Sequence, residues 1–392
     1  MAETWNNWSG SVSCTPRSIH RPRHEGEAAD LVRDVAARNG RLRVAGSGHS
    51  FTPLCASDDT LVSLDEMQGV VDVDVERQQA TVRAGTKIYE LGEPLAGHGL
   101  ALANQGDIDR QALAGAIATG THGTGPTLGS LSTQVVGLRL VDGRGELREI
   151  DARQGELLAA ARVSLGALGL ITAIRLQLVP AYRLHERLWQ VPIEACLAEL
   201  PAHIAATRHF EFFWYPATDL AHMKALDPTD ASPSSLDDRS GERIDHSYRI
   251  FPSERNVRFN EIEFALSAAA GPACFRAVRG LMRDRFVDVT WPVEYRTLAS
   301  DDILLSPAQG RETVTISVHQ AAELSFREFF REVEAIFLDH EGRPHWGKIH
   351  MLTAERLRQL YPGWKRFQAA RRELDPAGVF SNAHLAQLWG ES

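Results

Sequence analysis

Residues 43–51 read R-V-A-G-S-G-H-S-F. An apolar lead-in ends in two glycines that flank a serine, and His49 follows at the point where the backbone is expected to turn. Glycine tolerates positive φ and has no Cβ, so a ligand can approach its N–H groups closely. Successive N–H groups in such a turn form an anion-binding nest. The stretch therefore predicts a short strand at Leu42–Ala45 followed by a phosphate-binding loop.

A second glycine-rich loop repeats this chemistry later in the chain. Thr119–Gly125 reads T-G-T-H-G-T-G and follows the apolar run Ala112–Ala118. Two phosphate-binding loops in one chain suggest a dinucleotide. A nicotinamide-binding unit is disfavoured, because no G-x-G-x-x-G opens a helix after the first strand with an acidic ribose contact further on.

Length, charge and cysteine usage narrow the class of protein. A chain of 392 residues exceeds the usual size of a single core, so two domains are expected. The net charge of −9 argues against a nucleic-acid partner, because phosphate backbones are held by clustered Lys and Arg. No run of 18 apolar residues and no secretory leader is visible, and the four cysteines have no metal-like spacing. We expect a cytoplasmic protein with no membrane span and no metal site.

Short strands and helices alternate in the first part of the chain. Apolar positions at i, i+3, i+4, i+7 and i+8 predict a helix at Glu25–Asn39. Period-2 patterns, an Asp-Gly turn and a glycine stop predict further elements. These are strands at Leu61–Leu64, Val70–Val75 and Gln79–Ala84, a helix at Ile88–His98, a hairpin of Gln134–Val141 with Glu146–Ile150, and a turn and long strand within Leu165–Val179.

From Ala181 the pattern changes to separate strands and helices with no glycine-rich loop, and Pro180 marks the expected boundary. The polar segment Asp227–Arg243 is expected to be a mobile surface loop. Strands are predicted at His209–Tyr215, Asn260–Leu266 and Glu312–His319, and helices at Ala273–Arg285 and Ala322–Asp339. The mixture of strands and helices favours an α+β fold.

Three motifs together resemble the vanillyl-alcohol-oxidase class of FAD flavoproteins: the two glycine-rich loops and R-P-H-W-G-K-I-H at Arg343–His350. Within that class the chain looks most like the sugar-lactone oxidases of the gulonolactone and arabinonolactone type, and next like the alditol oxidases. The likeness runs from Trp8 to Leu385. It implies a two-subdomain FAD-binding domain at residues 1–179, an α+β substrate (cap) domain at 180–344, and a segment at 345–392 that returns to the FAD domain and completes the active site.

The resemblance implies FAD as the cofactor. In the family, the position matching Gly106 resembles a gate, because a small residue there leaves oxygen a path to the flavin ring; the alternative is a plain turn glycine. Any single loop glycine can likewise be an ordinary turn residue. The residues implied as cofactor contacts are His49, Ala45, Gly46, Ser47, Gly48, Ser50, Phe51, Gly106, Asp107, Gly115, Thr119, Gly120, Thr121, His122, Gly123, Gly125, Gly169, Ile171, Asn382 and His384.

The resemblance gives His49 a covalent role, because the family's histidine in this pattern is joined to the 8α-methyl group of FAD. Imidazole is nucleophilic when it is neutral, and its pKa lies near physiological pH. The alternative is a histidine that only hydrogen-bonds the nest.

Four later residues are implied at the substrate. Glu294 and Arg296 are two apart on an extended segment and so face the same way, where they can read sugar hydroxyls and a lactone carbonyl; elsewhere such a pair is usually a surface salt bridge. Lys348 would stabilise a developing alkoxide; the alternative is a solvated lysine. On a strand it would share a face with Trp346 and His350, with His345 on the other side. His319 would point into the same cavity.

The sequence thus predicts an FAD-dependent oxidase that transfers hydride from an aldonolactone to flavin N5, with molecular oxygen as acceptor and hydrogen peroxide as product. An alditol oxidase using a polyol is the next reading, and a lactone dehydrogenase with another electron acceptor is the third. From a different class, a non-catalytic flavin-binding module would need Glu294, Arg296 and Lys348 to be incidental. A monomer or small homo-oligomer is expected.

Overall fold

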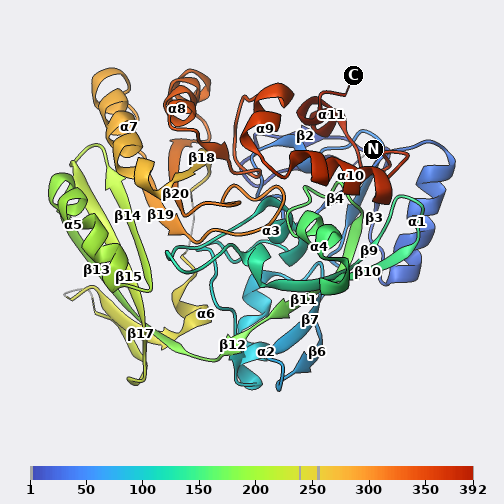
Figure 1. Cartoon of the computed structure of the whole chain (residues 1–392), viewed down its shortest axis with the longest axis horizontal. Helices are drawn as coiled ribbons and strands as arrows, with labels where there is room; N and C mark the ends of the chain where they lie inside the picture. Colours follow the sequence, from blue (N-terminus) through green and yellow to red (C-terminus); the bar gives the residue numbers. More distant parts are fainter. Residues whose placement is uncertain (1–2, 238–239, 254–256, 392) are drawn as a thin grey trace.

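The computed structural model describes residues 3–237, 240–253 and 257–391. Figure 1 shows two halves side by side, with the N-terminal elements around α1 on the right and one large sheet on the left. The C-terminal helices α9, α10 and α11 lie back over the N-terminal half. The architecture is α+β, as the sequence predicts.

A small parallel sheet carries the first glycine-rich loop. Its strands, in the order β3, β5, β4, are Ser18–His20, Thr60–Ser63 and Leu42–Ala45. Strand β4 has the predicted bounds, and the loop leaves its end directly. Helix α1 (Glu25–Ala37) joins β3 to β4, and the side chain of His24 accepts a hydrogen bond from the Glu27 N–H at its start.

An antiparallel sheet completes the N-terminal half. In the described residues its strand order is β10 (Leu147–Asp151), β9 (Val135–Val141), β11 (Leu170–Gln177), β7 (Gln79–Arg83), β6 (Val70–Asp74). The predicted hairpin is confirmed, because β10 pairs with β9 through Leu147 and Val141. The apolar run before the second loop forms α3 (Leu113–Thr119), which ends at Gly120 with φ +80°.

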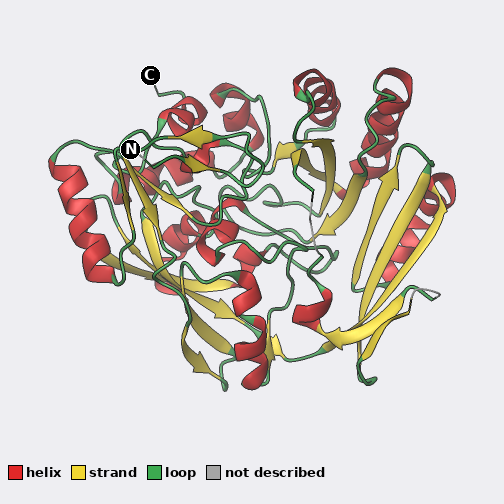
Figure 2. Ribbon diagram, turned by 180° about the vertical axis from the view of Figure 1, so that it is seen from behind, coloured by secondary structure: helices red, strands yellow, loops and turns green. Residues whose placement is uncertain are grey.

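The other half, on the left in Figure 1 and on the right in Figure 2, is built on an antiparallel sheet of nine described strands. Helices α5 (Ile193–Ala206), α7 (Gly271–Arg285) and α8 (Arg327–Asp339) pack on one face of it. The strand order is β16 (Ser234–Asp237), β17 (Glu242–His246), β13 (Arg183–Pro192), β15 (Leu220–Thr229), β14 (His209–Tyr215), β19 (Val293–Leu298), β20 (Thr313–Ala321), β18 (Phe259–Ser267), β21 (Arg343–Pro344).

Strand β19 shows how the two faces of this sheet differ. Tyr295 stacks on Phe212 at 5.0 Å and meets Phe275 of α7, so it faces the helices. Glu294 and Arg296 alternate with Tyr295 and therefore project from the opposite face. Their predicted shared orientation is confirmed by a direct Arg296–Glu294 ion pair.

Short elements link these layers. They are β1 (Trp5–Asn6), β2 (Ser13–Cys14), η1 (Pro53–Cys55), η2 (Ile88–Glu90), α2 (Gly92–Gly97), β8 (Leu100–Ala101), η3 (Leu131–Gln134), η4 (Ala152–Gln154), α4 (Gly155–Ala161), β12 (Val179–Pro180), α6 (Ser247–Ile250), η5 (Ala268–Ala270), α9 (Ala354–Leu360), α10 (Trp364–Leu374) and α11 (Ala383–Trp389).

Three sequence expectations need correction. Asp227–Arg243 is largely strand, in β15, β16 and β17, because its backbone pairs along the sheet edge; its polarity reflects exposure. Residues 238–239 of that segment lie outside the described residues. The helix expected at Ile88–His98 is instead a short 3₁₀ helix, η2, followed by a separate helix, α2. Pro94 has no backbone N–H and is tolerated only in the first turn of a helix, so a new helix begins just before it. The helix expected from Ala322 begins at Arg327.

The returning C-terminal segment is tied to β4. The Leu42 N–H donates to the Val379 carbonyl at 2.8 Å, and Arg43 donates to the Phe380 carbonyl at 2.5 Å. One hydrophobic cluster extends from α1 through the large sheet to α11. No helix in the described ranges is both long and apolar enough to cross a membrane.

Candidate active site

The first glycine-rich loop turns sharply after β4. Gly48 has φ +71°, and its carbonyl accepts a hydrogen bond from the Trp8 N–H at 2.7 Å. The Ser47 hydroxyl is buried and has no hydrogen-bond partner among the described residues. A buried hydroxyl without a partner is costly. This loop therefore offers at least one polar group that a bound ligand can satisfy.

Three cavities follow one another around this loop. The β4 cavity and the sheet cavity both reach Ser50 and Thr119. The nest cavity shares Ser50 with both, Gly46 with the β4 cavity and His49 with the sheet cavity. Together they suit an elongated ligand rather than a compact one.

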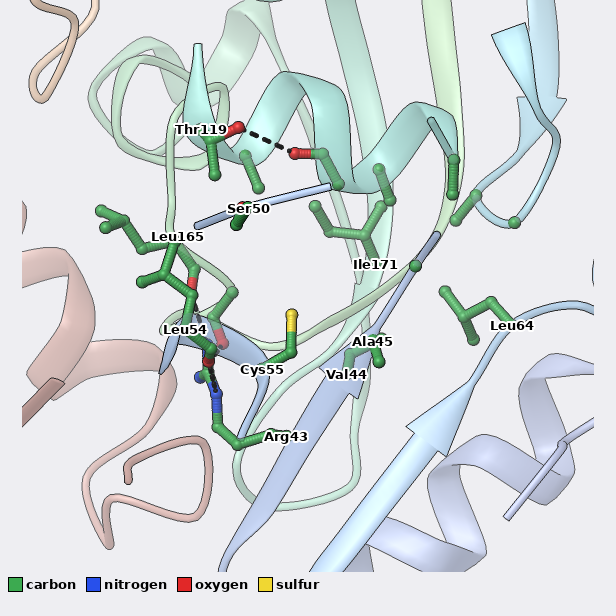
Figure 3. Close-up of a pocket in the computed structure, with 18 of the residues that line it drawn as sticks. Arg43, Val44, Ala45, Ser50, Leu54, Cys55, Leu64, Thr119, Leu165 and Ile171 are labelled. Carbon is green, nitrogen blue, oxygen red and sulfur yellow. Dashed lines mark hydrogen bonds between the residues drawn. The ribbon is translucent and has the colours of Figure 1, made fainter. Parts of the chain in front are cut away.

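Figure 3 shows the β4 cavity, with α3 above it and β4 below. Its lining is mostly apolar, including Leu64, Leu165 and Ile171. Arg43 lies at its edge, and its guanidinium donates to the carbonyls of Leu54, Leu165, Gly166 and Phe380. Burial lowers the pKa of Arg43 to about 10. Arg43 thus fixes three separate segments around this cavity.

The sheet cavity has a charged wall formed by β19 and its neighbours. Arg296 donates to Glu211 Oε2 at 2.7 Å, lies 3.4 Å from Asp107 Oδ1 and contacts Glu294. Burial alone would lower the pKa of Arg296, but Glu211, Glu294 and Asp107 outweigh it and raise the pKa well above its usual value. Arg296 is therefore a fixed cation held by three carboxylates.

A second charged group involves Lys348. Its ammonium lies 2.5 Å from Glu261 Oε2, and Glu261 Oε1 lies 3.7 Å from His319 Nε2. Burial opposes the charge on Lys348, but Glu261 and Glu263 outweigh it and raise its pKa. The three ligand-type groups Glu261, Glu294 and His319 all lie within 4.8 Å of one another, which joins this group to the Arg296 wall.

A turn places Lys348, and this corrects the expectation of a strand. After β21 the chain forms a turn in which the Lys348 N–H donates to the His345 carbonyl at 2.9 Å. His345 and Lys348 therefore line the same cavity. Trp346 instead points away, where its Nε1–H donates to Leu305 and its ring stacks on Tyr361.

His49 lies where the nest and sheet cavities meet. Its ring stacks on Trp8 with centroids 5.7 Å apart. Burial, and then the charge of Lys348, lower the pKa of His49 to about 4. The imidazole is therefore neutral at neutral pH, which is the nucleophilic form.

Most of the predicted cofactor contacts lie along the three cavities. They are Ala45, Gly46, Ser47, Gly48, His49, Ser50, Phe51, Gly106, Asp107, Gly115, Thr119, Thr121, His122, Gly169 and Ile171. Gly120, Gly123, Gly125, Asn382 and His384 are not among the lining residues. Gly120 caps α3, Gly123 packs on the Gln105 carbonyl, Gly125 bridges to Leu298, and Asn382 caps α11.

Sequence reasoning missed four buried polar residues. Glu261 and Glu263 lie two apart in the apolar strand β18, and this spacing already placed both carboxylates on one face. Glu211 carries a similar signal, because it is the one acidic residue in the aromatic strand β14. His345 was assigned to the wrong side because the turn after β21 was not recognised.

Two family comparisons decide the classification. The chain matches the FAD-binding domain over residues 16–151, and D-arabinono-1,4-lactone oxidase over residues 174–240 and 234–388, which is more than half of the chain. The chain belongs to the D-arabinono-1,4-lactone oxidase family. It is thus an FAD-dependent oxidoreductase of the kind that the sequence motifs indicate.

The proteins that this chain resembles differ in the activities for which they are named. It is 38% identical to an L-gulono-1,4-lactone dehydrogenase of Mycobacterium tuberculosis (strain ATCC 25618 / H37Rv), over 100% of both chains. It is 30% identical to an alditol oxidase of Streptomyces sp., over 99% of both. Cholesterol oxidase from B. sterolicum shares the fold, with a TM-score of 0.89 and 17% identity, covering 99% of this chain and 97% of that one.

The residues present fit FAD. A dinucleotide is elongated, and the three cavities lie next to one another around Ser50, with the unpartnered Ser47 hydroxyl belonging to a residue that lines the nest cavity. The nest loop places glycines where a pyrophosphate would need close backbone approach. The apolar β4 cavity suits one end of such a ligand, and the charged sheet cavity suits the reacting end.

Proposed function

We propose that this protein oxidises a hydroxyl group beside the carbonyl of an aldonolactone, with covalently bound FAD as hydride acceptor and molecular oxygen as the final acceptor. The observation that carries the proposal is the charged wall of the sheet cavity, where Lys348 and Arg296 face the same space as His49 and Gly106. When bound there, FAD supplies the hydride acceptor, and the protein supplies orientation and charge.

The chain would hold FAD along all three cavities. The β4 cavity would take the adenine half, the nest loop the pyrophosphate, and the sheet cavity the flavin ring. His49 is the attachment candidate, since burial keeps its ring neutral and it lies at the entrance to the sheet cavity. We assign the FAD-binding domain to residues 1–179, the cap to 180–344 and the closing segment to 345–392.

Lys348 and Arg296 would act on the substrate. The Lys348 ammonium stabilises negative charge that develops on the hydroxyl oxygen as it loses its proton. Arg296 offers a forked donor for the lactone carbonyl or a neighbouring hydroxyl. His319 was expected to point into the same cavity, but it is not among the residues that line it. Its Nδ1–H donates to the Pro292 carbonyl at 2.8 Å and its Nε2 lies 3.7 Å from Glu261 Oε1, so it would receive the proton only by way of Glu261.

Gly106 favours oxygen as the acceptor. Gly106 lines the sheet cavity, and a Cβ added there would lie 3.0 Å from the His122 carbonyl oxygen, so a larger residue would crowd this wall. The dehydrogenase relative makes another acceptor the alternative. The alditol oxidase relative, which matches over 99% of both chains, likewise makes a polyol the alternative substrate.

Two measurements test the proposal. Anaerobic mixing with a panel of aldonolactones and alditols should bleach the flavin, and admission of oxygen should then release one peroxide per flavin. Lys348→Met should slow bleaching of the flavin without preventing flavin binding. The control Lys365→Met changes an exposed lysine of α10 and should leave the rate of bleaching unchanged. Absence of bleaching by every compound would overturn the catalytic reading. Bleaching without peroxide would favour a dehydrogenase.

The covalent link has its own test. After denaturation, the intact mass should exceed that of the polypeptide by one FAD, and His49→Ala should lose the increment. Free FAD released by denaturing the unaltered protein would refute the link but not the oxidation chemistry.

A further inference from the structure

A groove separate from the three cavities lies among the C-terminal helices, and we call it the arginine groove. Helices α9 and α10, the chain between α10 and α11, the end of α11 and Arg41 line it (Figure 1). In the part of the chain that the structure describes, none of its lining residues also lines the β4, nest or sheet cavity. The proposed reaction gives this groove no role.

Arginine gives the groove an excess of positive charge, although the chain as a whole carries a net charge of −9. Its charged lining residues are Arg41, Arg358, Arg371, Arg372, Asp375 and Glu391. The Asp375 carboxylate is already engaged, because its two oxygens accept the Val379 and Phe380 N–H groups at 2.8 Å. Glu391 is then the carboxylate that pairs with an arginine of the groove.

The end of α11 brings Glu391 to the groove. Gly390 has φ +69° and stops the helix, and the Glu391 N–H donates back to the Ala386 carbonyl at 2.8 Å. This is the hydrogen bond of a Schellman turn. The Glu391 carboxylate then accepts from both terminal nitrogens of the Arg371 guanidinium. The groove thus already holds one anionic group, in the forked geometry that suits a carboxylate or a phosphate.

The other three arginines of the groove have no carboxylate of this kind. Arg358 donates to the Trp389 carbonyl at 2.8 Å, and Arg41 reaches two backbone carbonyl oxygens at 3.3 and 3.5 Å. Arg372 is exposed, and it pairs with none of the described residues. Because a guanidinium carries five N–H donors, each of these arginines has donors left for a ligand.

Two buried donors in the lining also lack an acceptor. Trp389 Nε1 and Gln368 Nε2 are buried, and neither has a hydrogen-bond partner among the described residues. Trp389 is only 4% exposed. Gln368 Oε1 accepts from Arg371 Nε at 2.9 Å, which leaves the amide nitrogen to donate elsewhere. A buried donor without a partner is unfavourable, so a bound acceptor would stabilise this wall.

These groups define the chemistry of a ligand. All of the unused groups are donors, so the ligand must be an acceptor. A free monocarboxylate would compete with the Glu391 carboxylate, which carries the same charge and is tethered to the chain. A phosphate group carries a charge of about −1.5 to −2 at neutral pH and three acceptor oxygens. It can therefore engage more than one guanidinium at once, and it attracts them more strongly than Glu391 does.

We propose that the arginine groove binds a phosphate group, free or at the end of a small ester, and that the phosphate displaces the Glu391 carboxylate from Arg371. Arg371 and Arg372 supply the charge, and Trp389 and Gln368 supply neutral donors. Glu391 is a tethered competitor that weakens binding. The proposal does not depend on the proposed oxidation of a lactone.

The first test is calorimetric titration of the FAD-loaded protein with inorganic phosphate, and in parallel with glycerol 3-phosphate, at constant ionic strength. The loaded protein is used because the nest loop of a flavin-free chain could also take up phosphate. Saturable binding of either compound is expected, whereas acetate should not bind. No saturable binding of either phosphate compound would overturn the proposal.

Arg372→Met locates the site. It should weaken phosphate binding about tenfold, the loss expected for one hydrogen bond from a charged donor. Arg276→Met is the matched control, because Arg276 is an exposed arginine of α7 in the other half, and it should leave the affinity unchanged. Both positions are exposed, so neither change should prevent folding. Equal affinity in Arg372→Met and the unaltered protein would place the phosphate elsewhere and refute the groove as its site.

Glu391→Gln tests the competition. Removing the tethered carboxylate should tighten phosphate binding about twofold to fivefold, which is the contribution of an exposed ion pair. Acetate should also gain measurable binding in this variant, because Arg371 then lacks its carboxylate. An unchanged or weaker affinity for phosphate in Glu391→Gln would refute the displacement.

Discussion

Arg296 gives the sharpest test of the buried charge wall. In Arg296→Ala, Glu211, Asp107 and Glu294 lose the cation that they share, in a position where the Arg296 side chain is only 8% exposed. Removing one partner from a buried ion pair typically costs about 3–5 kcal/mol, because the remaining charge is left uncompensated. We expect a loss of unfolding free energy of that size at neutral pH, and loss of flavin bleaching by substrate.

The loss should also depend on pH in a defined direction. Burial tends to raise the pKa of Glu211, but Arg296 and then Lys224 outweigh it and lower the pKa. A carboxyl with a lowered folded-state pKa contributes stability above its unfolded-state pKa, and this stability is lost as the pH falls through the folded-state pKa. Without Arg296 that contribution disappears, and burial raises the pKa of Glu211. The difference in unfolding free energy between the variant and the unaltered protein should therefore become smaller as the pH falls.

Urea unfolding followed by tryptophan fluorescence, at about pH 7 and about pH 5, measures this difference. Arg285→Ala is the matched control, since Arg285 is 53% exposed and pairs with Glu332 on the surface, where a pair contributes at most about 1 kcal/mol. A change below about 1 kcal/mol for Arg296→Ala, with no trend with pH, would show that the three carboxylates do not depend on Arg296.

Three further substitutions test other parts of the site. Gly106→Ala should slow reoxidation of the flavin by oxygen roughly tenfold, ~1.4 kcal/mol of barrier, with little change in its reduction by substrate; stopped-flow absorbance separates the two steps, and equal slowing of both would contradict the gate. Arg43→Met should cost about 3–5 kcal/mol in urea unfolding, because four carbonyl oxygens lose a charged donor; a neutral result would contradict its anchoring role. Gly123→Ala should lower the melting temperature, since its Cβ would lie 2.3 Å from the Gln105 carbonyl oxygen; an unchanged melting temperature would show that the loop relaxes freely.

Local patterns predicted much of the fold. Strands β4 and β14 have the predicted bounds, since each is a short apolar run with clear ends. The alternation of Glu294 and Arg296 also follows from strand periodicity alone. The prediction of a loop at 227–243 was wrong because an exposed strand and a loop are both polar, and only backbone pairing with β13 distinguishes them.

The site was less predictable than the fold because its partners are far apart in sequence. Glu263 meets His122 across 141 positions, and Arg296 meets Glu211 across 85. No pattern within one segment specifies such pairs. The turn that brings His345 and Lys348 together is local, but it follows a two-residue strand, and the same letters read equally well as a longer strand.

A crystal structure of the FAD-loaded protein tests the central claim most directly. The account predicts flavin density in the sheet cavity, with the reactive edge of the ring toward Lys348 and Arg296 and the pyrophosphate against the Gly46–Gly48 loop. Density that places the ring in the β4 cavity, or leaves Lys348 out of contact with the space above the ring, would contradict it.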